Sequence, residues 1–420
     1  MTLAHGHAVR RGNVIYLACA TAFVAVIWVT FRGSWPPDLS AVYFGALSYA
    51  EGDHHLIYLS PEMFFGGSAS DAWSARAAAL GPEGALALPY VYAPIWAAVL
   101  APVAAHLDPV RFFDVALLVH AVLCAAGVGL AYRIAGPSMS LTRWSLLSFG
   151  VLLVASPVFI SFWLNQPQIF VTFLILLAFE RYKSGALIAA GIILGFAAAL
   201  KLAPAALALI FVLDRAWKPL CVSVGTGLAL LGISLLVAGP DLHYAFLLQL
   251  QKAGNFLIVT PLNYGAEALF PAVGGMFDQP PLSLSETAGY AIYASSAWVG
   301  VAGLVCYLIV AGMLFVAGGS LVARLMALWA ALILFGPLGW SHYLIGPLLL
   351  LPAFLTGRTV LPALLALGLV SSPLTALHAT TGLPVVVPIA CGVSAILLLI
   401  GLGLRGGGGS QGASIYAGQN

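Results

Sequence analysis

Runs of about 20 apolar residues recur from residue 13 to residue 404, and they restrict the possible folds of this chain. A run of that length is what a helix needs to cross the roughly 30 Å hydrocarbon core of a bilayer. Hydrophobic residues make up 62% of the chain and charged residues 7%, whereas about a quarter of a soluble domain is charged. The sequence therefore predicts an all-α, polytopic membrane protein.

Twelve membrane spans are predicted, several of them interrupted by Pro or Gly. They cover residues 13–31, 112–132, 144–161, 168–180, 184–200, 202–214, 219–238, 290–315, 322–339, 343–357, 359–377 and 384–404. The stretch 86–106 is also apolar, but it contains Pro89, Pro94 and Pro102. It is predicted to be a re-entrant or interfacial hairpin packed against protein, because lipid cannot satisfy irregular backbone.

The charges predict the orientation of these spans. With a cytoplasmic amino terminus, eleven basic residues face the cytoplasm: Arg10, Arg11, Arg133, Arg143, Arg181, Lys183, Arg215, Lys218, Arg324, Arg358 and Arg405. Five face the other side: Arg32, Arg76, Arg111, Lys201 and Lys252. This excess of inner Lys and Arg follows the positive-inside rule. Multiple passes with a cytoplasmic amino terminus are therefore predicted, and the expected location is a bacterial inner (plasma) membrane.

Two long extracytoplasmic loops, residues 32–111 and 239–289, hold most of the acidic residues in this topology. Only Glu180 and Asp214 among the fourteen Asp and Glu lie on the inner side. Residues 1–404 are predicted to form one transmembrane domain, and residues 405–420, which are rich in Gly, a flexible cytoplasmic tail. A monomer embedded in membrane lipids is expected.

Two classes of partner are set aside by composition. The net charge is only +2 and the basic residues are scattered, whereas nucleic-acid binding requires clustered Lys and Arg. No metal site is predicted, because His54 and His55, near Glu51 and Asp53, lack ligand spacing for one ion. No cofactor is expected either.

Asp38 follows the first span within Trp35-Pro36-Pro37-Asp38-Leu39. Two prolines stiffen the backbone ahead of it, so its carboxylate is a candidate general base at the membrane surface. Position alone favours a plainer role, because Asp is a favoured N-cap for a helix that starts at Leu39.

Lys201, in Ala199-Leu200-Lys201-Leu202, is a lysine between two apolar segments on the side with few basic residues. A buried ammonium is costly in a membrane and usually faces a pathway or a partner, and here a lipid phosphate is suitable. The alternative is a side chain that extends to the interface.

Further polar candidates lie at predicted outer turns. His342, in Trp340-Ser341-His342-Tyr343, is suited to hydrogen-bond a phosphate, although an aromatic interfacial belt has the same composition. Gln168, at the mouth of a helix, is suited to bind sugar hydroxyls, and interhelical hydrogen bonding is its alternative use.

The order of these features resembles glycosyltransferase family 87. These are polyprenyl-phosphate-mannose-dependent transferases of the GT-C superfamily, and they include mycobacterial enzymes that extend phosphatidylinositol mannosides. The segment 186–201, which ends in Leu200-Lys201, is similar to a glycine- and alanine-rich run of that family. The turn from Trp340 to Tyr343 resembles its Trp-Ser-His motif. Weaker similarities occur at Tyr92-Ala93-Pro94, Pro167-Gln168 and Asn263-Tyr264.

The resemblance implies a GT-C fold and an inverting transfer of mannose from polyprenyl-phosphate-mannose to a lipid-linked or glycolipid acceptor, on the extracytoplasmic side. Asp38 corresponds to the catalytic base, and Lys201 and His342 to residues near the donor phosphate. Contacts with the sugar or the acceptor are expected from a set of polar and aromatic residues: Tyr43, Tyr92, Gln168, Asn263, Trp340 and Tyr343.

Two alternatives stay open at the level of sequence. One is a GT-C transferase that uses another polyprenyl-phosphate sugar, such as glucose, arabinose or an aminosugar. The other is a lipid or solute transporter, which would be expected to carry paired intramembrane charges and an internal repeat. Neither feature is evident in the sequence.

Overall fold

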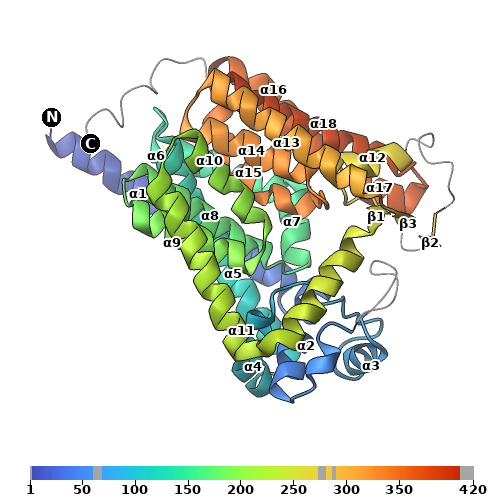
Figure 1. Cartoon of the computed structure of the whole chain (residues 1–420). Helices are drawn as coiled ribbons and strands as arrows, with labels where there is room; N and C mark the ends of the chain where they lie inside the picture. Colours follow the sequence, from blue (N-terminus) through green and yellow to red (C-terminus); the bar gives the residue numbers. More distant parts are fainter. Residues whose placement is uncertain (1, 60–68, 273–280, 286–289, 407–420) are drawn as a thin grey trace.

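The structure is a computed structural model that describes residues 2–59, 69–272, 281–285 and 290–406 (Figure 1). Its architecture is helical throughout apart from one small sheet, which confirms the predicted all-α class. Most of the predicted tail, residues 407–420, lies outside the described residues.

Long apolar helices form the main bundle. Six of the described helical segments are long and apolar enough to cross a membrane: α1 (Thr2–Phe31), α5 (Pro109–Ala135), α11 (Trp217–Gly254), α13 (Ala297–Ala317), residues 357–381 with η5 (Gly357–Thr359), α16 (Val360–Ser371) and α17 (Leu374–Thr381), and α18 (Val386–Arg405). A seventh is possible if α6 (Leu141–Val154) and α7 (Ser156–Trp163), which meet at 67°, form one bent span. Pro157, the second residue of α7, explains that bend, because its ring prevents continuous helical hydrogen bonding.

The other predicted spans are shorter helices in the structure. They are α8 (Gln168–Lys183), α9 (Leu187–Leu200), η2 (Ala203–Ala208), α10 (Leu209–Leu213), α14 (Leu321–Phe335), η3 (Ser341–Leu344), α15 (Ile345–Leu350) and η4 (Leu351–Phe354). At 1.5 Å per residue, a helix of 14 residues is about 21 Å long, which is less than the bilayer core. Prolines account for two of the interruptions, since Pro204 and Pro352 are each the second residue of a 3-10 element.

Two predicted boundaries are corrected by the structure. The predicted outer loop 239–289 begins as helix, because α11 bends at Gly239 (φ 76°) and Pro240 and continues to Gly254. The predicted span 290–315 begins as a strand, and its helix starts only at Ala297. That strand, β3 (Tyr290–Ala294), lies between β1 (Phe256–Val259) and β2 (Ser283–Ser285) in an antiparallel sheet, with Phe256 opposite Ala294.

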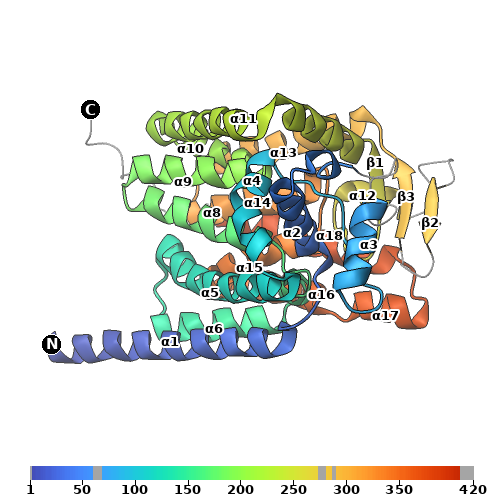
Figure 2. The same ribbon diagram turned by 90° about the horizontal axis from the view of Figure 1, so that it is seen from below.

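The first predicted outer loop, 32–111, folds into a separate small unit. It contains α2 (Pro37–Ala50), η1 (His54–Leu56), α3 (Asp71–Leu80) and α4 (Pro94–His106). Instead of a hairpin, the stretch 86–106 is an extended segment followed by α4, which starts at Pro94 because the fixed φ of Pro suits the first helical turn. Figures 1 and 2 show α2, α3 and α4 together beside the second half of α11.

Two hydrophobic cores result from this arrangement. The larger core fills the helical bundle, and the smaller one joins α2, α3 and α4 with the start of α5. The short helix α12 (Ala266–Ala272) packs between β1 and α18. The candidate site lies where the small unit meets the bundle, because α4 contacts both α2 and α11, and Trp96 of α4 donates to the Ala199 carbonyl at the end of α9 (3.0 Å).

Candidate active site

Asp38 is the second residue of α2 and is half-buried. The residue at the N-cap position is Pro36, and Pro37 occupies the first helical position. Asp38 therefore does not cap this helix, which removes the plainer role that its position allowed. A carboxylate in the first turn is still favoured by the helix dipole, and the Asp38 side chain makes no capping hydrogen bond with the described residues.

Burial raises the pKa of Asp38 from 3.8 to about 7, and the nearby ammonium of Lys201 moderates the increase. No Lys or Arg of the described residues lies within ion-pair distance of this carboxylate. A carboxylate whose pKa is close to neutral is well matched to accept a proton at physiological pH.

Lys201 lies directly after α9, in extended conformation, where it caps the end of that helix. Its Nζ is 4.3 Å from the centre of the Tyr343 ring, a cation–π contact. The ammonium is also close enough to influence the charge of both Asp38 and His342. The charge of Lys201 therefore acts both on Asp38 in the small unit and on the turn after α14.

Tyr92 stands in the extended segment before α4, and its phenol lies near Asp38 and Tyr343. Burial first, and then the negative charge of Asp38, raise the pKa of this phenol well above its usual value. The hydroxyl is accordingly protonated and able to donate a hydrogen bond. Tyr58 anchors the segment, because its hydroxyl donates to the Tyr92 carbonyl (2.6 Å).

His342 is 4% exposed and lies between two aromatic rings. It stacks on Trp340 at 6.2 Å between ring centroids and meets the edge of Tyr343 at 4.6 Å. Its Nε2 is buried and has no hydrogen-bond partner among the described residues. Because a buried polar atom is costly without a partner, this nitrogen is suited to receive a ligand.

Asn263 holds the turn that carries His342. Its Oδ1 accepts from the backbone N–H groups of Gly265 (3.0 Å) and Gly339 (3.1 Å), and its Nδ2 donates to the Ile258 carbonyl (2.8 Å). An isolated bridge pairs Asn263 with Trp340. Since Asn263 is fully buried and these bonds engage both ends of its amide, it positions the turn instead of presenting its side chain to a sugar.

Tyr43 also has a packing role in the structure. It is 4% exposed, its hydroxyl donates to the Leu107 carbonyl (3.1 Å), and its ring contacts Phe112 and Phe113. These contacts place it in the small hydrophobic core. The expectation of a sugar contact from Tyr43 has no support in this arrangement.

Gln166 is a residue that the sequence did not single out. It follows Asn165, whose left-handed backbone (φ 47°) is held because its side chain bonds His120 Nδ1 (2.8 Å) and the Phe113 carbonyl (2.8 Å). Gln166 is 4% exposed, and its Oε1 has no hydrogen-bond partner among the described residues. Ser161 links Gln166 to the His342 turn. The Ser161 carbonyl accepts from the Gln166 N–H, and the Ser161 hydroxyl donates to the His342 carbonyl.

Gln168 has a different environment. It lines a cavity of about 140 Å³ together with Pro204, Leu207, Trp329 and Tyr343. The remaining lining is apolar apart from backbone. The Tyr343 ring, which contacts the Lys201 ammonium, forms part of the wall of this cavity. An apolar chain on a ligand bound at Lys201 therefore has room to extend into the cavity.

The residues suspected of metal binding are engaged otherwise. Arg76 pairs with Glu51 (2.5 Å) and with Asp53 (3.6 Å), and His54 stacks on Tyr49. Within the described residues, no three His, Cys, Asp or Glu side chains gather in a way that could hold a metal ion.

Comparison with protein families gives the enzyme class of the chain. The model of glycosyltransferase family 87 matches residues 90–338, more than half of the chain. The chain belongs to glycosyltransferase family 87. It is therefore a membrane glycosyltransferase, an enzyme that requires a sugar donor and an acceptor.

The matched range contains part of the site of this transferase. Tyr92, Gln168 and Lys201 fall within it, whereas Asp38 and the turn from Trp340 to Tyr343 lie outside. The geometry described above connects these outlying parts with the matched region. A comparison with curated proteins found no match for the chain.

Proposed function

We propose that this transferase moves a mannosyl residue from polyprenyl-phosphate-mannose to a lipid-linked or glycolipid acceptor, with inversion at the anomeric carbon. The observation that carries this proposal is the half-buried Asp38 carboxyl, whose pKa is about 7, beside the ammonium of Lys201. A base and a nearby cation are the two groups that a displacement at a sugar phosphate needs.

The reaction proceeds as a single displacement in this proposal. Asp38 accepts the proton of an acceptor hydroxyl, and that oxygen forms a bond with the anomeric carbon. The bond between the anomeric carbon and the phosphate oxygen breaks, and polyprenyl phosphate leaves with the electron pair. Lys201 stabilises the negative charge that develops on the leaving phosphate, and His342 Nε2 is placed to hydrogen-bond the same group.

The sugar is assigned to the space between the small unit and the His342 turn. Tyr92 and Tyr343 bring aromatic rings to this space, and Trp340 stacks behind His342. The unpartnered Oε1 of Gln166 is suited to accept a hydrogen bond from a sugar hydroxyl. The apolar cavity beyond Tyr343, which Gln168 lines, is suited to the first isoprene units of the donor.

The orientation follows from the distribution of charges. The excess of Lys and Arg predicted to face the cytoplasm leaves Asp38, Lys201 and His342 on the extracytoplasmic side of a bacterial inner membrane. We propose that residues 1–404 act as one transmembrane domain, as a monomer, and that the acceptor reaches Asp38 from that side.

The proposal is tested with the purified full-length protein in nanodiscs and a panel of labelled donors. Polyprenyl-phosphate-mannose is expected to yield labelled glycolipid with an inverted anomeric configuration. Matched polyprenyl-phosphate-glucose, polyprenyl-phosphate-arabinose and nucleotide-mannose serve as controls. Transfer from nucleotide-mannose alone would refute the lipid-phosphate donor, and preference for another polyprenyl-phosphate sugar would refute mannose while leaving the mechanism intact.

A further inference from the structure

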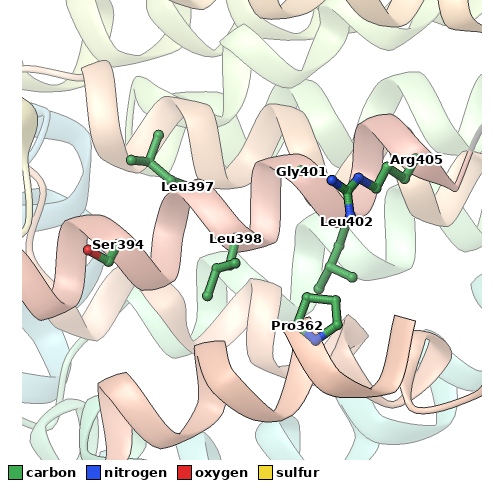
Figure 3. Close-up of a pocket in the computed structure, with 7 residues that line it drawn as sticks. All are labelled: Pro362, Ser394, Leu397, Leu398, Gly401, Leu402 and Arg405. Atoms are coloured by element: carbon green, nitrogen blue, oxygen red, sulfur yellow. The ribbon is translucent and has the colours of Figure 1, made fainter. Parts of the chain in front are cut away.

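A groove between α16 and α18 shares no lining residue with the cavity at the candidate site. It has a volume of about 450 Å³, and Figure 3 shows Leu398 and Leu402 of α18 directed toward Pro362 of α16, with Leu397 on the other side of α18. Leu397 is 52% exposed. Only Ser394 and Arg405 contribute polar side chains to its lining.

The basic residues at one end of this groove have no acidic partner. Arg405 is the last residue of α18, and Arg358 precedes α16 by two residues. The two helix ends are neighbours, because Gly406 lies beside the Phe354 ring. Both arginines are exposed, and no carboxylate of the described residues is within ion-pair distance of either.

The sequence offers no side chain to neutralise this charge locally. No Asp or Glu follows Glu286 in the chain. The third arginine of this region, Arg324, is already paired with Asp214. Any anion that pairs with Arg405 or Arg358 is therefore expected to be a ligand and not a carboxylate of the described residues.

We propose that the groove binds an anionic phospholipid, with one acyl chain along Leu398 and Leu402 and the phosphate at Arg405, near Arg358. The membrane surrounds these helices with lipid, and basic sites between transmembrane helices bind acidic headgroups. An apolar groove that ends at an arginine favours a phospholipid over a free phosphate ion, because a phosphate ion has no acyl chain to pack against the leucines. The guanidinium also matches phosphate geometry by two parallel hydrogen bonds.

The site is tested with the full-length protein in nanodiscs of phosphatidylcholine with a minority of phosphatidylglycerol. After gentle extraction, native mass spectrometry measures the retained lipid. The wild type is expected to retain phosphatidylglycerol in preference to the more abundant phosphatidylcholine. Arg405→Gln is expected to lower this retention at least fivefold, and Arg405→Lys to preserve part of it.

Two further variants distinguish the contribution of the apolar groove to lipid retention from that of the arginine charge. Leu398→Trp fills the groove and is expected to lower retention while Arg405 stays in place. Arg143→Gln removes another exposed inner arginine, at the start of α6, and is expected to behave as the wild type. Thermal unfolding in detergent identifies any variant that fails to fold. If Leu398→Trp fails to fold, lipid retention by the milder variant Arg405→Gln decides whether the site exists.

Several outcomes would overturn the proposal. These are equal retention of the two lipids by the wild type, unchanged retention in both Arg405→Gln and Leu398→Trp, and equal losses in Arg143→Gln. Displacement of the lipid by millimolar inorganic phosphate would assign the site to a free anion. A stable dimer that depends on Leu397 would assign the groove to a second copy of the chain.

Discussion

Asp38 differs from two carboxylates at the opposite end of the helical bundle, Glu180 and Asp214. At the end predicted to face the cytoplasm, Glu180 accepts from Arg181 (2.5 Å) and Arg133 (3.5 Å), and Asp214 is paired with Arg324 and accepts from the Tyr182 hydroxyl (2.9 Å). At the end predicted to face the other side, Asp38 has no ion pair within the described residues, and burial raises its pKa to about 7. Paired carboxylates stabilise the packing, whereas an unpaired one at neutral pKa is available for proton transfer.

The difference has an energetic basis. A buried charge is tolerated when an opposite charge and hydrogen bonds compensate for its lost hydration. Asp38 lacks that compensation except for the nearby Lys201, so its ionised form is less stable in the folded protein than in water. This cost is expected to be offset when an acceptor hydroxyl binds to the carboxylate.

The largest expected effect is that of Asp38→Asn. The amide cannot accept the acceptor proton, so turnover is expected to fall by about 10²- to 10⁴-fold, the usual contribution of a general base. Initial rates of labelled sugar transfer measure this. Glu51→Gln, at the other end of α2, removes an exposed ion pair and is the matched control with near-normal turnover.

Thermal melting distinguishes a loss of turnover in Asp38→Asn that reflects catalysis from one that reflects misfolding. The pKa of Asp38 is higher in the folded protein than its ordinary value, so its contribution to stability is complete below about pH 4 and is lost as the pH rises through 7. Asp38→Asn is therefore expected to melt no lower than the wild type at pH 8. Full turnover in the variant would exclude Asp38 as the base.

Lys201→Met is expected to lower kcat/KM for the polyprenyl-phosphate donor by about 10²-fold, because it removes the charge that stabilises the leaving phosphate. The variant keeps a side chain of similar length beside Tyr343. Lys252→Met, on α11, is the control for the loss of an outer lysine. Equal kcat/KM for Lys201→Met and Lys252→Met would show that Lys201 has no part in donor use.

Arg324→Gln removes an ion pair at the end of the bundle that is predicted to face the cytoplasm. It leaves Asp214, whose side chain is 17% exposed, without its ion-pair partner. The free energy of unfolding is expected to decrease by roughly 1–3 kcal/mol, below the range for fully buried pairs. Thermal melting measures this, and the double variant with Asp214→Asn is expected to recover part of the loss. A large loss of turnover in folded Arg324→Gln would contradict the division between the two ends.

The smallest expected effect is a change of rate with pH. Because Asp38 must be ionised to act as the base, kcat/KM is expected to fall about fivefold between pH 7 and pH 6 and to level off above pH 8. Stopped assays over pH 5.5–8.5 on the wild type measure this dependence. A flat profile over that range would assign the proton transfer to a different group.

Much of this architecture could be read from the sequence. The apolar runs predicted most helices of the main bundle, since composition decides which segments leave water, whereas α2, α3, α4 and the second half of α11 lie in predicted loops. Asp38, Lys201 and His342 were singled out because each is a polar group in an apolar context. Gln166 was overlooked, because only the left-handed turn at Asn165 and the neighbouring Ser161 bring it to the His342 turn.

By itself, the sequence determined the membrane class, the helical segments and the uneven distribution of charge. The tertiary structure decided where helices break, that the first outer loop is a helical unit, and that Tyr43 and Asn263 serve packing and positioning. It also brought together Asp38, Tyr92, Lys201 and His342, which are distant along the chain. The physical reason is that transfer from water depends on local composition, whereas the meeting of distant side chains depends on how whole helices pack.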